Sequence, residues 1–217
     1  MKTDAQLRHD VEEELEWDPR FDARDIGVAA KSGVVTLSGH VGSFAERWSA
    51  QEATQRVGGV KAIANEIEIK LPASAQRSDT ELAEAALHAL SLNSAVPVGA
   101  IKVAVQGGWI TATGQVSFWY QKEAVETTLR QLRGVIGFSN DIQLKASASA
   151  LDVKGRIENA FRRHAQLDAD KIQVKVADGT VILEGEVQSW RERNEAEVAA
   201  WAAPGVRNLQ DKLTIRT

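Results

Sequence analysis

A threefold internal repeat constrains the fold of this chain more than any other feature of its sequence. The segment Gly33–Val41 (GVVTLSGHV) returns 75 residues later as Gly108–Val116 (GWITATGQV) and 71 residues after that as Gly179–Val187 (GTVILEGEV). Both offsets hold without gaps through most of each copy. A period of about 70 residues is longer than that of solenoid repeats, so each copy is predicted to be a small domain with its own core.

We therefore predict three tandem domains, at residues 1–71, 77–146 and 148–217. The stretches that join them are small and polar, LPASAQ at 71–76 and ASAS at 146–149, and such compositions suit short linkers. The sequence has no cysteine, which excludes disulfides, thiolate metal sites and cysteine nucleophiles together.

Hydrophobic periodicity predicts a helix at the start of each copy, followed by two strands. Apolar residues recur four apart in the first segment, which is typical of one helical face, and Asp18-Pro19 ends the first of these helices. Ser78 or Asp79, with Glu81 downstream, supplies an N-cap in the second copy. Alternation of two then indicates a pair of strands. The predicted tight turns between them are Ser32-Gly33, Gly107-Gly108 and Asp178-Gly179.

A second helix and a third strand complete each copy. In the first copy the helix is expected from about Ser43 to Val57 and the strand from Val60. Gly59, Gly134 and Gly205 are expected to take a left-handed conformation where the second helix stops. The fold class is thus α+β: three αββαβ domains, each a three-stranded sheet with two helices on its one apolar face.

One polar column lies in phase with the buried residues of the third strand. It consists of Asn65, Asn140 and Asp211. A polar group at such a position needs a fixed hydrogen-bond partner, and we expect a loop backbone to provide it.

Composition excludes several protein classes. The 217 residues are 43% hydrophobic and 26% charged, with a formal net charge of −4, which describes a soluble globular chain. No apolar run is long enough to cross a membrane, and the mild acidity argues against nucleic-acid binding. The start lacks the apolar region of a secretory signal, so a cytoplasmic location is expected if Met1 is the native start, and a periplasmic one if a signal has been removed.

Nothing in the sequence favours catalysis, and we expect neither an enzyme, a metal site nor a cofactor. The four histidines fall at non-equivalent repeat positions, and no phosphate-binding or nucleophile motif occurs. Asp168 and Asp170 could bind a cation, but one carboxylate pair without further spaced ligands is a weak calcium signal.

The repeat has three features beyond its element order: a Gly-x-Val/Ile-x-Leu-x-Gly-x-Val strand, an aromatic and an acidic or amide residue that open the second helix, and a closing motif, Gly59–Ile67 (GVKAIANEI) in the first copy. Together with the αββαβ order, these features resemble the BON domain, which is named for bacterial osmotically inducible and nodulation proteins. The resemblance covers nearly the whole chain, three times. It implies a non-enzymatic module of bacterial stress-response, outer-membrane and secretin-associated proteins, with a role in attachment to phospholipid. The best-known osmotic-shock member carries two such domains and a periplasmic signal, and this chain differs in both respects.

An aromatic column supplies the candidate binding residues. Phe44, Trp119 and Trp190 open the second helix of each copy, and Arg47, Lys122 and Arg193 follow three residues later. Such a ring could insert at the headgroup level of a membrane while the cation meets lipid phosphate. The alternative is that the ring packs against its own domain or the next copy.

Two further tryptophans fall outside the apolar pattern. Trp109 lies on the outward phase of its strand, and Trp201 lies off the apolar stripe of its helix. Both are expected to be exposed within their own domains, first as contacts between tandem domains and second as part of a partner-binding surface.

Charge is distributed unevenly among the copies. Residues 1–72 carry 9 basic and 13 acidic groups, whereas the middle copy carries 6 of each and the last 11 of each. Attraction to anionic lipid would therefore have to come from the last domain. The leading hypothesis is a non-catalytic, stress-associated protein that binds phospholipid or another amphipathic surface. The alternative is a protein-interaction scaffold, chaperone-like or ion-sensing, without membrane binding.

Overall fold

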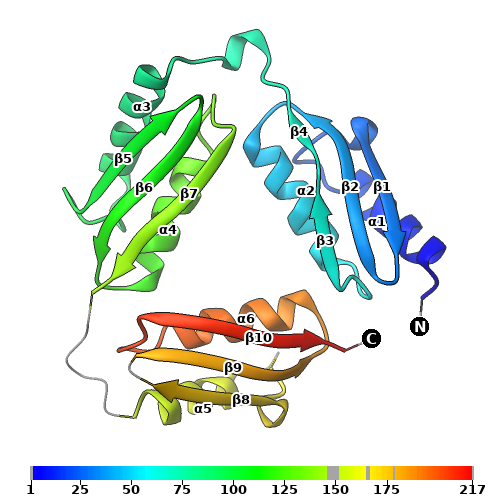
Figure 1. The fold of residues 1–217 in the computed structure, drawn as a ribbon, viewed down its shortest axis with the longest axis vertical. Coiled ribbons are helices and arrows are strands. Elements are labelled where there is room, and N and C mark those ends of the chain that lie inside the picture. Colours follow the sequence, from blue (N-terminus) through cyan, green and yellow to red (C-terminus); the bar gives the residue numbers. More distant parts are fainter. Residues whose placement is uncertain (1, 146–151, 165–166, 178, 217) are drawn as a thin grey trace. The chain divides into compact units, whose positions relative to one another are not determined.

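The computed structural model describes residues 2–145, 152–164, 167–177 and 179–216, and each of the three repeats folds as a separate αββαβ domain (Figure 1). The predicted linker at 146–149 and Asp178 of the third predicted turn lie outside the described residues. The helices and strands have the following bounds. In the first domain they are α1 (Asp4–Trp17), β1 (Ile26–Lys31), β2 (Val34–Val41), α2 (Phe44–Arg56), β3 (Ala62–Asn65) and β4 (Glu68–Ile69). In the second domain they are α3 (Asp79–Leu92), β5 (Ile101–Gln106), β6 (Trp109–Val116), α4 (Trp119–Arg130) and β7 (Gly137–Leu144). In the third domain they are α5 (Val153–Arg163), β8 (Ile172–Ala177), β9 (Thr180–Val187), α6 (Trp190–Trp201) and β10 (Asn208–Ile215).

Each sheet has its second strand in the middle. The orders are β1-β2-β3, β5-β6-β7 and β8-β9-β10, and in the first domain β4 continues the third strand along β2. The first two strands form an antiparallel hairpin, as in the pairing of Ile26 with Gly39. The third strand returns through the second helix and is parallel to the middle one, for example from Asn208 against Thr180. Figure 1 shows both helices of a domain on the same side of its sheet.

The core of each domain consists of the apolar columns that the repeat predicts. The helical stripe Leu7, Val11 and Leu15 is buried, as are its counterparts in α3 and α5. The middle strands add buried residues such as Val35 and Leu37. Burial of these stripes, at about 25 cal/mol per Å² of apolar surface, drives the folding of each domain.

The expected glycine caps and the expected start of the third strand were wrong by a few residues, whereas α2 has the expected bounds to within one residue. Gly59, Gly134 and Gly205 do have positive φ, near 100°. However, α2 ends at Arg56, three residues before its glycine, and α4 and α6 end four residues before theirs. The residue after each glycine, predicted to begin the third strand, is buried in the connection instead. The glycines therefore shape the loop between helix and strand, and they do not cap the helix directly.

A glycine in the middle strand is required by close backbone contact. Gly39 has φ +108°, and a Cβ placed there would lie 1.9 Å from the carbonyl oxygen of Asp25. Its counterpart Gly185 has φ +137° and the same conflict, at 2.0 Å, with Lys171. No side chain can be accommodated at that separation, so the second glycine of the repeated strand motif allows the hairpin to close over the preceding turn.

Candidate binding surface

The predicted aromatic column lies at the first residue of the second helix in every domain. Phe44, Trp119 and Trp190 begin α2, α4 and α6, and each ring is half-buried. The column is thus a repeated feature of the fold, and its rings expose part of their surface. Its role in binding stays a prediction.

The cations one turn later point toward the sheet of their own domain. The Arg47 guanidinium donates to the backbone oxygen of Asn65 at 2.9 Å, and the Lys122 ammonium donates to the backbone oxygen of Ile142 at 2.9 Å. Arg193 forms a salt bridge with Asp211 and also lies 5.0 Å from the centre of the Trp190 ring. All three cations therefore attach the second helix to the third strand, which is a structural use of their charge.

The polar column has a partner in the second helix in addition to the loop backbone that was expected. Asn65 accepts a hydrogen bond from the backbone N–H of Ile67 at 3.3 Å, but its amide group donates to Gln51 in α2 at 3.2 Å. In the second domain Asn140 donates to Glu126 in α4 at 3.0 Å. The expected loop-backbone partner is thus present in the first domain, where Ile67 lies between β3 and β4, and the second helix, which crosses over this column, supplies a further partner that was not expected.

In the third domain the same column holds two carboxyl groups. Asp211 and Glu197 stand where the first domain has Asn65 and Gln51. Burial, together with the hydrogen bond and the charge of Asp211, raises the pKa of Glu197 to about 8. Burial alone would raise the pKa of Asp211 as well, but the hydrogen bonds from Glu197, the Leu213 N–H and Arg193 lower it. The pair therefore shares one proton at neutral pH.

The acidic or amide residue after each aromatic folds back on the loop that precedes its helix. Glu46 accepts the backbone N–H of Gly42 at 2.9 Å, and Gln121 accepts those of Ser117 and Phe118 at 3.0 and 3.1 Å. Its counterpart in the third domain, Glu192, is buried and accepts two backbone N–H groups. These contacts satisfy donors near the helix N-terminus.

Two exposed aromatic residues that the repeat comparison missed flank Trp119 in the second domain. Phe118 and Tyr120 are 55% and 54% exposed, and their rings stack with centroids 5.7 Å apart. Phe118 stands where the other domains have Ser43 and Ser189, whose side chains cap α2 and α6. A phenylalanine has no oxygen with which to cap a helix. The departure of one copy from the other two is the signal that could have identified this pair.

The two remaining tryptophans differ from each other. Trp109 is 46% exposed on the outer face of its sheet, as its phase predicts, where its indole donates to the Ser139 hydroxyl at 3.0 Å and lies against Gly137. Trp201 is half-buried and packs against the core of the third domain. It is the last residue of α6, and part of its surface stays accessible, so its role in a contact or a binding surface stays a prediction.

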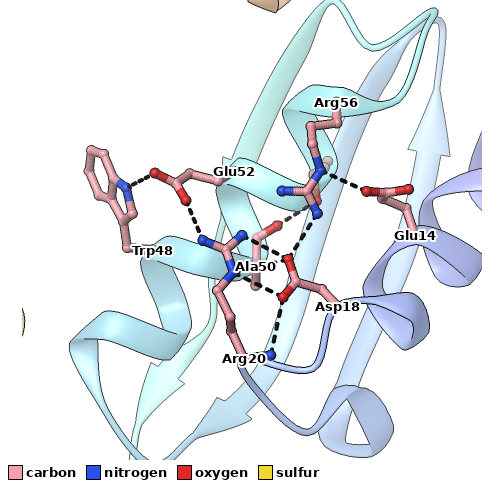
Figure 2. A network of polar contacts seen from close by, with 8 residues as sticks. Glu14, Asp18, Arg20, Trp48, Ala50, Glu52 and Arg56 are labelled. Carbon is pink, nitrogen blue, oxygen red and sulfur yellow. Dashed lines mark hydrogen bonds and ion pairs between the residues drawn. The ribbon is translucent and has the colours of Figure 1, made fainter.

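The first domain carries a charged network between its two helices (Figure 2). The Asp18 carboxylate is buried and receives the guanidinium groups of Arg20 at 2.7 Å and Arg56 at 2.8 Å. Arg56 also pairs with Glu14 at 2.7 Å, and Arg20 pairs with Glu52. The hydrogen bonds from Arg20, opposed by burial and reinforced by Arg56, hold the pKa of Asp18 well below its usual range. Every charge in this network is matched, so it stabilises the helix pair and does not form an open site.

Among the residues that the structure describes, no three metal-ligating side chains gather into a possible metal site. In the same part of the chain, no helix has both the length and the hydropathy needed to span a bilayer.

Comparison with known proteins identifies the repeated unit. The family model of the BON domain matches residues 3–70, 78–146 and 149–217. The chain belongs to the BON domain family. No curated protein matches it.

Similar solved structures include CdsD, a structural protein of the type III secretion system of Chlamydia trachomatis. One CdsD structure is 13% identical, with 96% of this chain and 91% of that chain covered and a TM-score of 0.27. A second, of the CdsD C-terminal domain, is 14% identical over the whole of both chains, with a TM-score of 0.26. The likeness is too low to carry any argument about function.

Proposed function

We propose that this triple BON-domain chain is a non-catalytic, stress-associated protein that binds a phospholipid surface through the exposed aromatic edge of its second domain. The observation that carries the proposal is the exposed, stacked pair Phe118 and Tyr120 at the start of α4. Tyrosine, which has an apolar ring and a polar hydroxyl, favours the headgroup region of a membrane, and the apolar ring of Phe118 beside it can insert among acyl chains.

The loss of a helix cap supports a binding role for this pair. Replacing a capping serine by an apolar residue costs a helix about 1 kcal/mol. The second domain nevertheless has Phe118 where its neighbours have Ser43 and Ser189. A residue that lowers the stability of its own helix and exposes its ring to water is better explained by a partner than by packing.

Among the residues that the structure describes, the second domain also has more exposed large hydrophobic side chains than either of its neighbours. Six of its large hydrophobic side chains are exposed, whereas Trp17 and Val34 are the exposed ones of the first domain. The second domain has no net charge, with 6 basic and 6 acidic residues. Binding through it would therefore depend on apolar insertion more than on attraction to anionic lipid.

The test is vesicle co-sedimentation of the full chain with Phe118→Ser and Tyr120→Ala. Phe118→Ser restores the cap of the sister domains, so we expect it to raise the stability of the second domain by about 0.5 to 1 kcal/mol while it weakens vesicle binding. The double variant should abolish pelleting with both neutral and anionic vesicles.

Trp17→Ala is the matched control, because Trp17 is 84% exposed but lies among carboxylates of the acidic first domain. Equal loss of binding in the control would contradict the proposal. Wild-type protein that pellets with no vesicle would exclude the membrane role and favour the protein-interaction scaffold.

A further inference from the structure

The third domain contains a cavity of about 330 Å³ between α5 and the end of α6. Its floor consists of small apolar side chains, Ala160, Ala199 and Ala202. Arg156, Asn159 and Arg163 stand along its rim on successive turns of α5. No carboxylate lines this cavity among the described residues.

Two alanines of the cavity lining stand where the first domain has an ion pair. An offset of 146 residues places Ala160 at the position of Glu14 and Ala202 at the position of Arg56. In the first domain Glu14 and Arg56 fill this place with an ion pair of 2.7 Å, and Arg56 reaches on to Asp18 (Figure 2). The third domain keeps the backbone of the helix pair and lacks the side chains that close it.

The rim has also reversed its charge. Arg156 stands where the first domain has Asp10, and Arg163 stands where it has Trp17. The corresponding helix surface of the first domain includes Asp10, Glu13 and Glu14. The same face of the fold is therefore acidic in one domain and basic in another.

Rim and floor together define the chemistry of a ligand. Guanidinium groups bind phosphate and carboxylate oxygens through paired hydrogen bonds. Arg156 and Arg163 are seven residues apart, about 10 Å along the helix, so their long side chains can approach one anion from both sides. An alanine floor suits a short apolar body, and the volume lies at the lower end of small-molecule sites.

We propose that this cavity binds a small organic anion, a phosphate or carboxylate group that carries a short apolar chain. The anion could be a free ester or the headgroup region of a lipid, since both present the same oxyanion. The site lies in the third domain and uses cations, so it is separate from the aromatic edge of the second domain.

The experiment follows backbone amides of the full chain by NMR while butyl phosphate is added. We expect saturable shifts confined to α5 and the end of α6, and smaller shifts with inorganic phosphate, which lacks the apolar chain. Arg156→Gln and Arg163→Gln should each weaken binding at least about fivefold, as expected for the loss of one exposed ion pair. Arg162→Gln is the matched control, because Arg162 is a neighbouring exposed arginine of the same helix that does not line the cavity.

A second variant fills the cavity without removing a rim arginine. Ala160→Glu with Ala202→Arg introduces the ion pair of the first domain, and it should abolish binding while the amide spectrum elsewhere stays that of a folded protein.

Titration with phosphatidylglycerol vesicles separates the two sources of the anion. If vesicle binding depends on Arg156 and Arg163, the anion is a lipid headgroup. If only butyl phosphate binding depends on them, the anion is a free ester. Absence of saturable shifts in both arms, survival of binding in the filled variant, or equal weakening by Arg162→Gln would overturn the proposal. Loss of the aromatic edge by Tyr120→Ala should leave butyl phosphate binding unchanged, so failure of one proposal is distinguishable from failure of the other.

Discussion

Where its two helices meet, the first domain holds a buried carboxylate between two guanidinium groups, whereas the third domain has alanines and a cavity. Where the second helix crosses the third strand, the first domain pairs two amides and the third pairs two carboxyl groups. Both domains nevertheless form the same hairpin and the same parallel third strand. Apolar columns and a few glycines determine this fold, and the polar positions between the elements are free to diverge.

The largest expected effect tests what the two domains share. Gly39→Ala and Gly185→Ala should each destabilise its own domain by about 3 kcal/mol, because a Cβ would collide with a backbone carbonyl at positive φ. Hydrogen exchange of peptides from β2 and β9 measures the stability of the first and the third domain separately. Gly58→Ala is the control, since open space surrounds that position, and it should change stability by less than about 0.5 kcal/mol. Tolerance of alanine at Gly39 but not Gly185 would show that the two hairpins close differently.

A smaller effect is expected where the domains differ. Asp18→Ala removes the buried carboxylate that accepts from Arg20 and Arg56, so the first domain should lose about 2 kcal/mol. His164 occupies the equivalent place and contacts only Glu195, at 3.8 Å, among its described ion pairs. His164→Ala should therefore change the free energy of unfolding of the third domain by less than about 0.5 kcal/mol. Hydrogen exchange of α1 and α5 in increasing denaturant would measure the loss of stability in each domain. Equal losses for Asp18→Ala and His164→Ala would show that the two positions do not differ in their contribution.

The carboxyl pair should make the third domain sensitive to pH. The folded pKa of Glu197, about 8, lies above its ordinary value of 4.5. Its contribution to stability is therefore complete below about pH 4.5 and is lost as the pH rises through 8. Since the Glu197 side chain is about one-third exposed, we expect the melting temperature of the third domain to be roughly 5 °C lower at pH 9 than at pH 5, equivalent to about 1 kcal/mol.

Glu197→Gln reproduces the first-domain residue and should abolish this pH dependence of β10 exchange between pH 5 and pH 9. The charged groups that face Glu197 are Asp211 and Arg193, and both are unchanged in the variant. A third domain that is equally stable at both pH values in the wild type would exclude the shared proton.

The smallest effect concerns the second domain, which is intermediate between the other two. Glu126 accepts from the amide of Asn140 at 3.0 Å and forms a longer ion pair with Arg130 at 3.8 Å, so Glu126→Gln keeps the hydrogen bond and removes only the ion pair. We expect less than about 0.5 kcal/mol of change. A larger loss of stability, measured by hydrogen exchange of β7, would indicate that the ion pair with Arg130 matters more than its length suggests.

The fold could be predicted from the sequence because comparison of three copies exposes its apolar columns and turns. The third-strand boundary could not, because Val60 is as apolar as a strand residue and only tertiary packing assigns it to a loop. The candidate binding surface was harder to predict from the sequence than the fold. Phe44, Trp119 and Trp190 were found as a repeated column, but Phe118 and Tyr120 break the repeat, and a search for repeated features overlooks them. The contacts of Arg47 with the third strand depend on the crossing of two elements that are 18 residues apart in sequence, which periodicity does not reveal.

The parallel pairing of each third strand has a consequence for the order of folding. The hairpin pairs residues that are close in the chain, whereas the third strand must wait until the whole second helix has returned it to the sheet. We therefore expect the contacts that hold this strand, including the Arg193 salt bridge with Asp211, to form late in folding, after the transition state. Their loss accelerates unfolding and leaves the folding rate almost unchanged. In this chain we therefore expect the cation that follows each aromatic residue to affect the lifetime of the folded domain more than the rate at which it folds.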